Sequence, residues 1–185
     1  MKLLLHICCA PCSIMCIETL RGEGIEPVGF WDNPNIHPFT EFRMRRNTLV
    51  DYAKEIGLSL VVEGGYGLRP FLEAVEGDFD GRCPVCYRLR MRSAARYAAE
   101  NGFTHFTTTL LISPYQNHEL LAQTAREAAE EFGVSFLYRD FRPSFREGQD
   151  RARAMGLYMQ KYCGCIFSEE DRYRKRKKPP KKEEA

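Results

Sequence analysis

Short apolar segments alternate with longer segments of helical periodicity along most of the chain. The segments that are apolar or otherwise typical of strands are residues 2–8, 27–31, 58–63, 105–110 and 134–139. The segments with helical spacing, each followed by a glycine, are residues 13–21, 40–56, 87–101 and 115–132. Between residues 64 and 86 the chain is rich in Gly, Pro and Asp, with one short helical segment near residues 71–75. The pattern predicts repeated strand–helix units and one exposed excursion.

Strands that alternate with helices favour right-handed βαβ units, and hence a mainly parallel sheet covered on both faces. The sequence therefore predicts an α/β fold, a Rossmann-like (HUP-like) three-layer sandwich formed by a single domain over residues 1–168. In such folds the functional groups lie on loops at the carboxyl ends of the strands. Cys8 and Cys9 follow the first predicted strand directly, so we expect a metal site at this edge of the sheet.

Composition places the protein among globular proteins, with 44% hydrophobic and 28% charged residues in 185. No apolar run approaches the roughly 20 residues of a membrane-spanning helix, and no secretion signal is evident, so we expect a cytoplasmic protein without membrane contact. Residues 169–185 hold eight Lys or Arg and five Asp or Glu, and the rest of the chain is nearly neutral. We expect these residues to form a basic, mobile tail.

Seven of the eight cysteines occur in three groups. The groups are Cys8, Cys9 and Cys12 in the segment CCAPC, Cys83 and Cys86 in a CxxC, and Cys163 and Cys165 in a CGC. Secreted disulfide scaffolds are short and poor in helical patterns, unlike this chain. The cysteines are therefore interpreted as reduced thiols that serve metal binding or redox chemistry. Cys16 follows Cys12 by one helical turn, and we interpret it as a core residue.

A CxxC presents two thiolates to one metal centre, and a second pair elsewhere in the fold can complete a shell of four. An iron-sulfur cluster and a structural zinc are both chemically admissible. Neighbours on a regular strand point to opposite sides, so Cys8 and Cys9 can share a centre only if the chain turns there, a turn that Pro11 would support. Instead of binding metal, the CCAPC cysteines could be two small buried side chains at the end of a strand. The CGC cysteines could be two unpaired thiols instead of a labile redox pair.

Five segments in order resemble the QueH family of epoxyqueuosine reductases. They are LHICCAPC at residues 5–12, NPNIHP at 33–38, CPVCYRLR at 83–90, TLLISPYQNHE at 109–119 and YCGCIFSE at 162–169. The resemblance implies reduction of epoxyqueuosine, at the wobble position of a tRNA anticodon, to queuosine. This is the last step of queuosine synthesis, and in this family it does not use cobalamin. The epoxide oxygen leaves as water after a two-electron reduction.

The resemblance also implies a cofactor and its ligands. The family carries a 4Fe-4S cluster, and the matching segments place its ligands at Cys8, Cys9, Cys83 and Cys86, with Cys163 and Cys165 as a redox-active pair. The position of Cys12 stays open, as a possible further metal ligand. One of the neighbouring thiols could instead hold a second mononuclear metal ion, iron or zinc, with a carboxylate such as Asp140 as a ligand. An unidentified low-potential electron donor is a further expected partner.

Proton donors and phosphate contacts are the next requirement of such a reaction. The candidates for proton transfer or substrate orientation are His6, His37, Tyr115, His118 and Asp140, and core or capping roles are equally open for each. Ser113 is a candidate helix N-cap, with Pro114 in the first turn. The candidate tRNA contacts are Arg43, Arg45, Arg46, Arg88, Arg90, Arg92 and the tail from Arg172 to Lys182, although the tail could equally be a solvated segment.

Two other functional classes fit parts of the sequence. A nucleotide-binding enzyme of the ATP-pyrophosphatase type would use the first strand–loop–helix unit, but CCAPC lacks the glycines that wrap a phosphate. A zinc-stabilised RNA-binding module without catalysis would need only the CxxC and the basic tail. That class leaves CCAPC and CGC unexplained.

Overall fold

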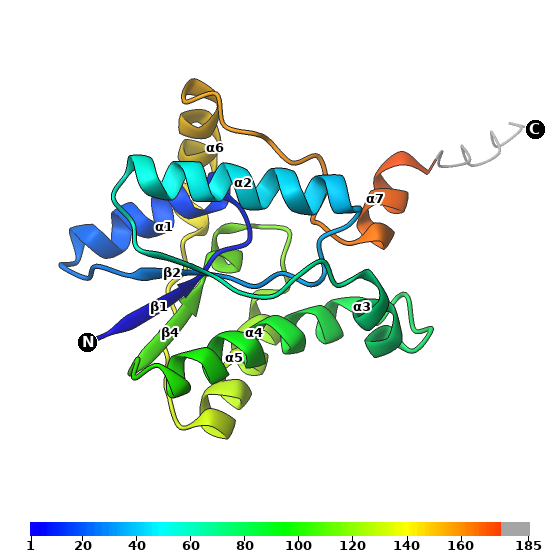
Figure 1. Ribbon diagram of the computed structural model, residues 1–185, viewed down its shortest axis with the longest axis horizontal. Helices are drawn as coiled ribbons and strands as arrows, with labels where there is room; N and C mark the ends of the chain where they lie inside the picture. The colour runs from blue at the N-terminus through cyan, green and yellow to red at the C-terminus, as the bar shows by residue number, and fades with distance from the viewer. Residues whose placement is uncertain (175–185) are drawn as a thin grey trace, which may run out of the picture.

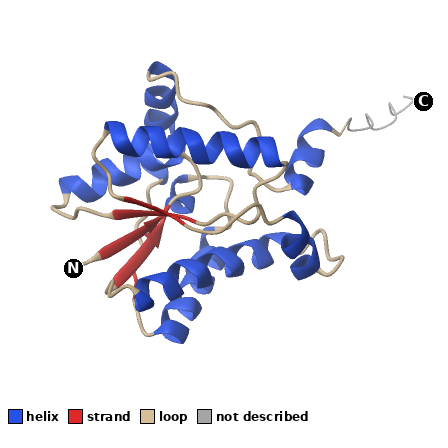
Figure 2. Ribbon diagram, viewed as in Figure 1, coloured by secondary structure: helices blue, strands red, loops and turns tan. Residues whose placement is uncertain are grey.

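Five parallel strands lie between two layers of helices in the computed structural model, which describes residues 1–174 (Figure 1, Figure 2). The strands are β1 (Leu3–His6), β2 (Val28–Trp31), β3 (Leu60–Val62), β4 (His105–Thr108) and β5 (Ser135–Phe136). The helices are α1 (Ala10–Gly22), α2 (Phe39–Glu55), α3 (Leu68–Val75), α4 (Arg82–Glu100), α5 (His118–Phe132), α6 (Phe145–Ala154) and α7 (Ile166–Tyr173), with short 3-10 turns η1 (Thr109–Ile112) and η2 (Arg142–Ser144). The layers confirm the predicted α/β class.

The order of the strands places a switch point beside β1. The order is β3-β2-β1-β4-β5, so β1 pairs with β2 on one side and with β4 on the other. After β3 the chain therefore crosses back over β1 and extends the sheet at its opposite edge. In open parallel sheets, ligands bind in the crevice at the carboxyl ends of the strands where the order reverses. The segments that leave β1 and β4 carry Cys8 and Thr109 into this crevice.

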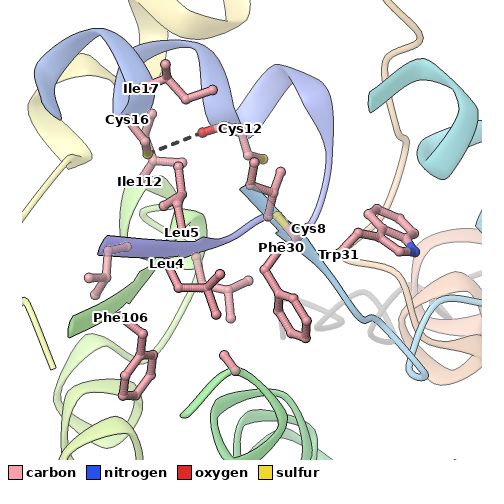
Figure 3. Packing of buried hydrophobic residues seen from close by; sticks show 14 of the residues in the cluster. Leu4, Leu5, Cys8, Cys12, Cys16, Ile17, Phe30, Trp31, Phe106 and Ile112 are labelled. Carbon is pink, nitrogen blue, oxygen red and sulfur yellow. Dashed lines mark hydrogen bonds between the residues drawn. The ribbon is translucent and has the colours of Figure 1, made fainter. Parts of the chain in front are cut away.

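The helices divide between the two faces of the sheet. In Figure 1, α1, α2 and α6 cover one face, and α3, α4 and α5 lie on the other. The central strand β1 is buried along its whole length, which is why residues 3–7 are a nearly continuous apolar run and not an alternating one. Leu4 and Leu5 pack in one cluster with Phe30, Phe106 and Ile112 (Figure 3).

Two helix starts differ from the sequence-based expectation in ways that matter for the site. α4 begins at Arg82 instead of residue 87, so Cys83 and Cys86 lie among its first five residues and not on a loop. α5 begins at His118 instead of residue 115, and its N-cap is Asn117, whose side-chain oxygen accepts the Leu120 N–H at 3.1 Å. Asn is as good a cap as Ser; the expectation that Ser113 caps this helix was therefore wrong.

Other differences have simple physical reasons. α1 begins at Ala10 instead of residue 13. Pro11 is tolerated in the first helical turn, because a backbone N–H at this position would have no partner within the helix. α6 was missed because its sequence, FREGQDRARA, buries only Gly148 and Ala152 and shows no apolar periodicity. α7 was also missed, and it runs through residue 168, the expected domain boundary. Residues 175–185 of the expected basic tail lie outside the described residues.

No helix within residues 1–174 combines the length and the apolar character that a bilayer crossing requires.

A candidate metal-thiolate site at the end of the central strand

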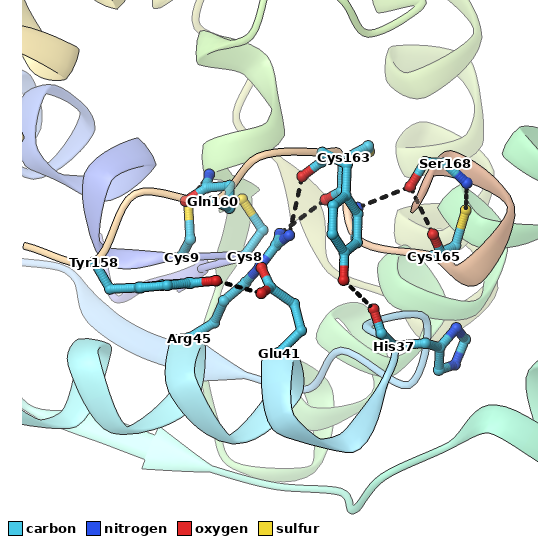
Figure 4. A network of polar contacts seen from close by, with 12 residues as sticks. Cys8, Cys9, His37, Glu41, Arg45, Tyr158, Gln160, Cys163, Cys165 and Ser168 are labelled. Carbon is cyan, nitrogen blue, oxygen red and sulfur yellow. Dashed lines mark hydrogen bonds and ion pairs between the residues drawn. The ribbon is translucent and has the colours of Figure 1, made fainter. Parts of the chain in front are cut away.

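The three cysteines of CCAPC converge on one point directly after β1. The sulfur atoms of Cys8, Cys9 and Cys12 all lie within 4.8 Å of one another, and those of Cys8 and Cys9 are 3.8 Å apart. The chain turns here because Cys9, in an extended conformation, is the N-cap of the helix that starts at Ala10. Neighbouring thiols that a regular strand would separate therefore face the same centre (Figure 4).

The spacing of this group fits thiolates around a single metal ion. Tetrahedral coordination with metal–sulfur bonds of about 2.3 Å puts neighbouring sulfurs about 3.8 Å apart. All three thiols are buried, which protects them from oxidation and excludes competing water ligands. Three protein ligands also leave a fourth coordination position open, as in catalytic sites. Among residues 1–174, no other group of three His, Cys, Asp or Glu side chains is this compact.

The protonation of the three thiols is unequal. Contacts with the thiols of Cys12 and then Cys9 hold the pKa of Cys8 well below its usual value, and the Thr109 hydroxyl, 3.4 Å from the Cys8 sulfur, adds to this effect. Burial raises the pKa of Cys9, and the contacts with Cys8 and Cys9 raise that of Cys12. Cys8 is therefore the thiol that carries negative charge first, and a thiolate is the form that binds metals.

The CxxC and the CGC meet beside this group. Cys165 packs against Cys86, Phe71 and Val75. Burial first, and then the charges of the CGC thiols, raise the pKa of Cys83, and the same causes, opposed by Arg90, raise that of Cys86 to about 12. All eight cysteines are free thiols, with Cys83 and the CGC's first cysteine exposed. The CxxC thus has the CGC as a neighbour, an arrangement that their distance in sequence did not reveal.

A buried arginine anchors the CGC segment to α2. The Arg45 guanidinium forms an ion pair with Glu41 at 2.6 Å and donates hydrogen bonds to the carbonyl oxygens of Tyr162 and Cys163, at 2.9 and 2.8 Å. The Tyr158 hydroxyl donates to the second carboxylate oxygen of Glu41 at 2.5 Å. This network, shown in Figure 4, binds the last loop of the fold to the helix beside the three-thiol group.

Burial of the side chain rules out two of the arginines that were expected to contact tRNA. Arg45 and Arg90 are each only 2% exposed, so neither can reach a phosphate, and both expectations were wrong. Both arginines lie on the faces of α2 and α4 that pack against the rest of the protein. The other four candidates on these helices are not buried: Arg43, Arg46, Arg88 and Arg92.

A cavity of about 270 Å³ opens over the thiols. Cys8 and Cys12 line it from the end of β1, and Cys163 lines it from the CGC. Tyr115 and Gln116, from the SPYQ segment after β4, also contribute to its lining, and Tyr115 is 85% exposed. The structure therefore brings members of the CCAPC, SPYQ and CGC segments around one space.

The other two candidates near α5 lie elsewhere. His118 contacts the Ser113 carbonyl at 3.0 Å and lines a separate surface groove that Arg142 also lines. Asp140 is paired with Arg142, whose hydrogen bonds lower the pKa of this carboxyl to about 2. Neither side chain is among those that line the cavity over the thiols.

The remaining two candidate histidines are packed inside the fold. Burial, assisted by the charge of Arg90, lowers the pKa of His6 to about 4, and its Nδ1 lies 2.9 Å from the Thr108 hydroxyl. His37 is also fully buried, with its ring against Tyr66 and Phe71.

Two glutamines beside the thiols were missed by the sequence analysis. The Gln160 side-chain amide donates to the Cys9 sulfur at 2.8 Å, and the Gln116 amide donates to the Cys163 sulfur at 3.5 Å. Hydrogen bonds to sulfur stabilise the thiolate form and tune metal centres. Gln116 lies in a motif that was singled out, whereas nothing in the sequence around Gln160 identifies it.

Replacing Gly164 with alanine should distort the CGC and destabilise the protein. Gly164 has φ +152°, and an added Cβ would lie 3.3 Å from Ile36 Cγ1 and 3.4 Å from Arg45 Nη1. We expect a loss of about 1–3 kcal/mol in the free energy of unfolding, measured by denaturant titration. Gly22→Ala is the matched control, since no atom lies within 4 Å of its added Cβ. Equal stability of Gly164→Ala and the wild type would contradict the expectation.

Acidification should loosen the contact between His37 and α7. The His37 Nε2–H donates to the Pro34 carbonyl at 3.0 Å, and Nδ1 accepts the Ile166 N–H at 3.3 Å, so the ring is neutral. Burial lowers the pKa of His37 below its usual 6.5. The unfolded chain then binds the proton more tightly, and the stabilisation from His37 is lost as the pH falls from about 6.5 towards the folded-state pKa.

The measurement is the free energy of unfolding between about pH 7.5 and pH 5.5, in the wild type and in His37→Phe. The wild type should lose more stability on acidification than the variant, which has no ring to protonate at this position. Identical pH dependence in the two proteins would show that His37 does not titrate in this way.

The comparisons with known proteins agree with the motifs. A family model described as epoxyqueuosine reductase QueH matches residues 3–171. Relatives named epoxyqueuosine reductase QueH include a Dehalococcoides mccartyi protein, 36% identical over 96% of this chain and 98% of the relative. Others are from Acinetobacter baylyi, 34% identical over 92% of this chain and 81% of the relative, and Thermotoga maritima, 33% identical over 89% and 88%.

A solved structure supports the fold class. It is described as a predicted subunit of a tRNA methyltransferase from Methanocaldococcus jannaschii, and it aligns with a TM-score of 0.50 over 83% of this chain and 88% of that chain. At 10% sequence identity the likeness concerns the fold alone, and it confirms the expected Rossmann-like (HUP-like) architecture. The family model covers most of the chain, and the sequence relatives exceed 30% identity over most of their length; the chain therefore belongs to the QueH family of epoxyqueuosine reductases.

Proposed function

We propose that this protein reduces epoxyqueuosine to queuosine at the wobble position of a tRNA anticodon, by metal-thiolate chemistry and without cobalamin. The observation that carries the proposal is the convergence of Cys8, Cys12 and Cys163 on one cavity in a chain of this family. The reaction takes up two electrons and two protons, breaks both C–O bonds of the epoxide, and releases the oxygen as water. We place it in the reducing cytoplasm, where free thiols persist.

The proposed cofactor is a 4Fe-4S cluster with Cys8, Cys9, Cys83 and Cys86 as ligands. A cluster carries several irons, so its ligands lie further apart than those of one ion, which suits a set drawn from the end of β1 and the start of α4. The tight spacing around Cys12 supports, in addition, a mononuclear iron or zinc beside the cluster. When bound, the cluster would supply single electrons and the mononuclear ion would supply Lewis acidity.

The CGC cysteines are the proposed second store of electrons. Closing a disulfide between Cys163 and Cys165 releases two electrons and two protons, which equals the demand of the reaction. Cys163 lines the cavity, and Gly164 between the two cysteines has a backbone conformation that favours glycine. An external low-potential donor, whose identity is open, would then restore the thiols or reduce the cluster.

The chain itself contributes binding and protons. The cavity over the thiols would take the modified base once the anticodon loop presents it unstacked, as sequence-specific RNA recognition requires. The exposed Tyr115 hydroxyl at the cavity is the proposed proton donor, with Thr109 supporting Cys8. His118 and Asp140, expected from the sequence as further catalytic groups, would serve this role only if they moved from their present partners.

Phosphate contacts are proposed for the arginines that remain accessible. These are Arg43, Arg46, Arg88 and Arg92. Arg92 is paired with Glu131, so it would exchange this partner for a phosphate. Each contact that forms should add to the salt dependence of tRNA binding. The tail from Arg172 onwards is a further proposed contact, and truncation after Glu169 should reduce the salt slope.

The test of the cofactor is the iron, sulfide and zinc content of anaerobically purified protein, with its visible spectrum. We expect about four irons in the cluster with a thiolate-to-iron band, both lost in Cys83→Ala and in Cys86→Ala. Cys16→Ala is the matched control, because Cys16 is a buried core thiol that donates to the Cys12 carbonyl at 3.4 Å and does not belong to the three-thiol group. One zinc without a chromophore would overturn the cluster and favour a zinc-stabilised RNA-binding module.

A further inference from the structure

One buried charge near the thiols has no carboxylate partner. Arg90 lies one turn after Cys86 on α4 and is only 2% exposed. Its Nη2 donates to the Cys86 sulfur at 3.1 Å, and its Nε donates to the Cys86 carbonyl at 3.3 Å. The head group therefore points at a sulfur atom. Arginines on a helix commonly extend the charged group to solvent instead.

The contrast with Arg45 shows what is missing. Arg45 is equally buried and forms an ion pair with Glu41. Arg90 takes part in none of the ion pairs formed within residues 1–174. An isolated buried cation is costly, and proteins retain one only where an anion compensates it. The groups whose negative charge acts on Arg90 are, in decreasing order, Cys86, Cys163, Cys8 and Tyr87, three of them thiols.

These three thiols come from three separate parts of the site. Cys86 lies near the start of α4, Cys163 belongs to the CGC, and Cys8 follows β1. The guanidinium donates directly to the sulfur of Cys86, and its burial limits the screening of its charge by water. A positive charge in this place stabilises whichever form of the site carries more negative charge. For a metal-thiolate centre that form is the reduced one, because each electron taken up adds a negative charge.

We infer that Arg90 is a positioning residue that compensates the charge of the thiolate centre and raises its reduction potential, so that the centre accepts electrons more easily. The inference rests on the proposed cluster, and it adds a residue that neither ligates metal nor contacts substrate. Its charge, and not its shape, is what the site requires. A merely structural role, in which the side chain fills space in α4, would instead depend on the apolar stem.

The test compares Arg90→Lys, which keeps the charge, with Arg90→Met, which keeps the apolar stem and loses the charge. Arg88→Gln is the control, since it removes a charge from the exposed face of the same helix. The readout is the midpoint potential of the anaerobic holoprotein, from a redox titration followed by visible and electron paramagnetic resonance spectra. We expect a clear shift to lower potential in Arg90→Met, a smaller shift in Arg90→Lys, and the wild-type potential in Arg88→Gln.

If Arg90→Met assembles no cluster, iron content replaces the potential as the readout. Recovery of iron by Arg90→Lys then supports a role of the charge, and failure of Arg90→Lys to recover it overturns the inference. A wild-type potential in Arg90→Met, or a shift in Arg90→Lys as large as that in Arg90→Met, also overturns it. A wild-type protein without a cluster would instead refute the proposed function, so the two failures are distinguishable.

Discussion

Replacing Cys8 with serine is expected to abolish metal binding and to lower the rate of epoxyqueuosine reduction by more than about 100-fold, since even outer-shell changes cost 10–100-fold. Cys8 belongs to the compact three-thiol group and to the proposed cluster ligands, and the contacts with Cys12 and Cys9 lower its pKa. A serine hydroxyl stays protonated where this thiol ionises. The measurements are iron and zinc per chain, and turnover of tRNA under anaerobic conditions.

Cys16→Ser is the control for this prediction. It makes the same change at a buried thiol in α1, one turn after Cys12, where no metal is expected. We expect some loss of stability in this variant and wild-type metal content. If Cys8→Ser kept metal content and turnover close to those of the wild type, the three-thiol group would not be the metal site.

Replacing Arg45 with methionine should destabilise the protein by about 3–5 kcal/mol, because it leaves the Glu41 carboxylate buried without its cation. It should also release the carbonyls of Tyr162 and Cys163, and so free the CGC segment from α2. We therefore expect a loss of turnover in addition to the loss of stability. Denaturant titration and the turnover assay measure the two effects separately.

Two further variants separate the ion pair from the anchor. In the double variant with Glu41→Met, the buried charge disappears as well, so most of the stability should return, whereas turnover should stay low. Arg46→Met, on the solvent side of the same helix, should change stability by less than about 0.5 kcal/mol. A double variant that recovers full turnover would show that Arg45 does not hold the CGC for catalysis.

The sheet could be predicted because most of its strands lie in short apolar runs between glycines and polar turns, and β4 is rich in β-branched threonine. β1 is the clearest case, since a central parallel strand is buried on both faces and its residues other than His6 are apolar. The position of Cys8 and Cys9 at its carboxyl end followed from the same pattern. The order of the strands did not, because the switch between β1 and β4 depends on pairing between residues about 100 positions apart.

Part of the site could be predicted from the spacing of its cysteines, and part could not. Spacing within a segment placed Cys8 and Cys9 together, but it could not show that Cys165 packs against Cys86. The arginines at positions 45 and 90 were interpreted as surface charges, because burial of a long charged side chain is rare and has no local sequence signal. The i, i+4 spacing of Glu41 and Arg45 is consistent with an ion pair, yet such pairs are usually exposed.

Conversion of epoxyqueuosine in tRNA tests the central claim most directly. Anaerobically purified protein, supplied with dithionite as electron donor and no cobalamin, is incubated with tRNA that carries the epoxide, and the nucleosides are analysed by mass spectrometry. The account predicts that the modified nucleoside loses one oxygen atom and becomes queuosine, with metal-loaded protein and not after chelation. Unchanged epoxyqueuosine with fully metal-loaded protein, or conversion that requires cobalamin, would contradict it.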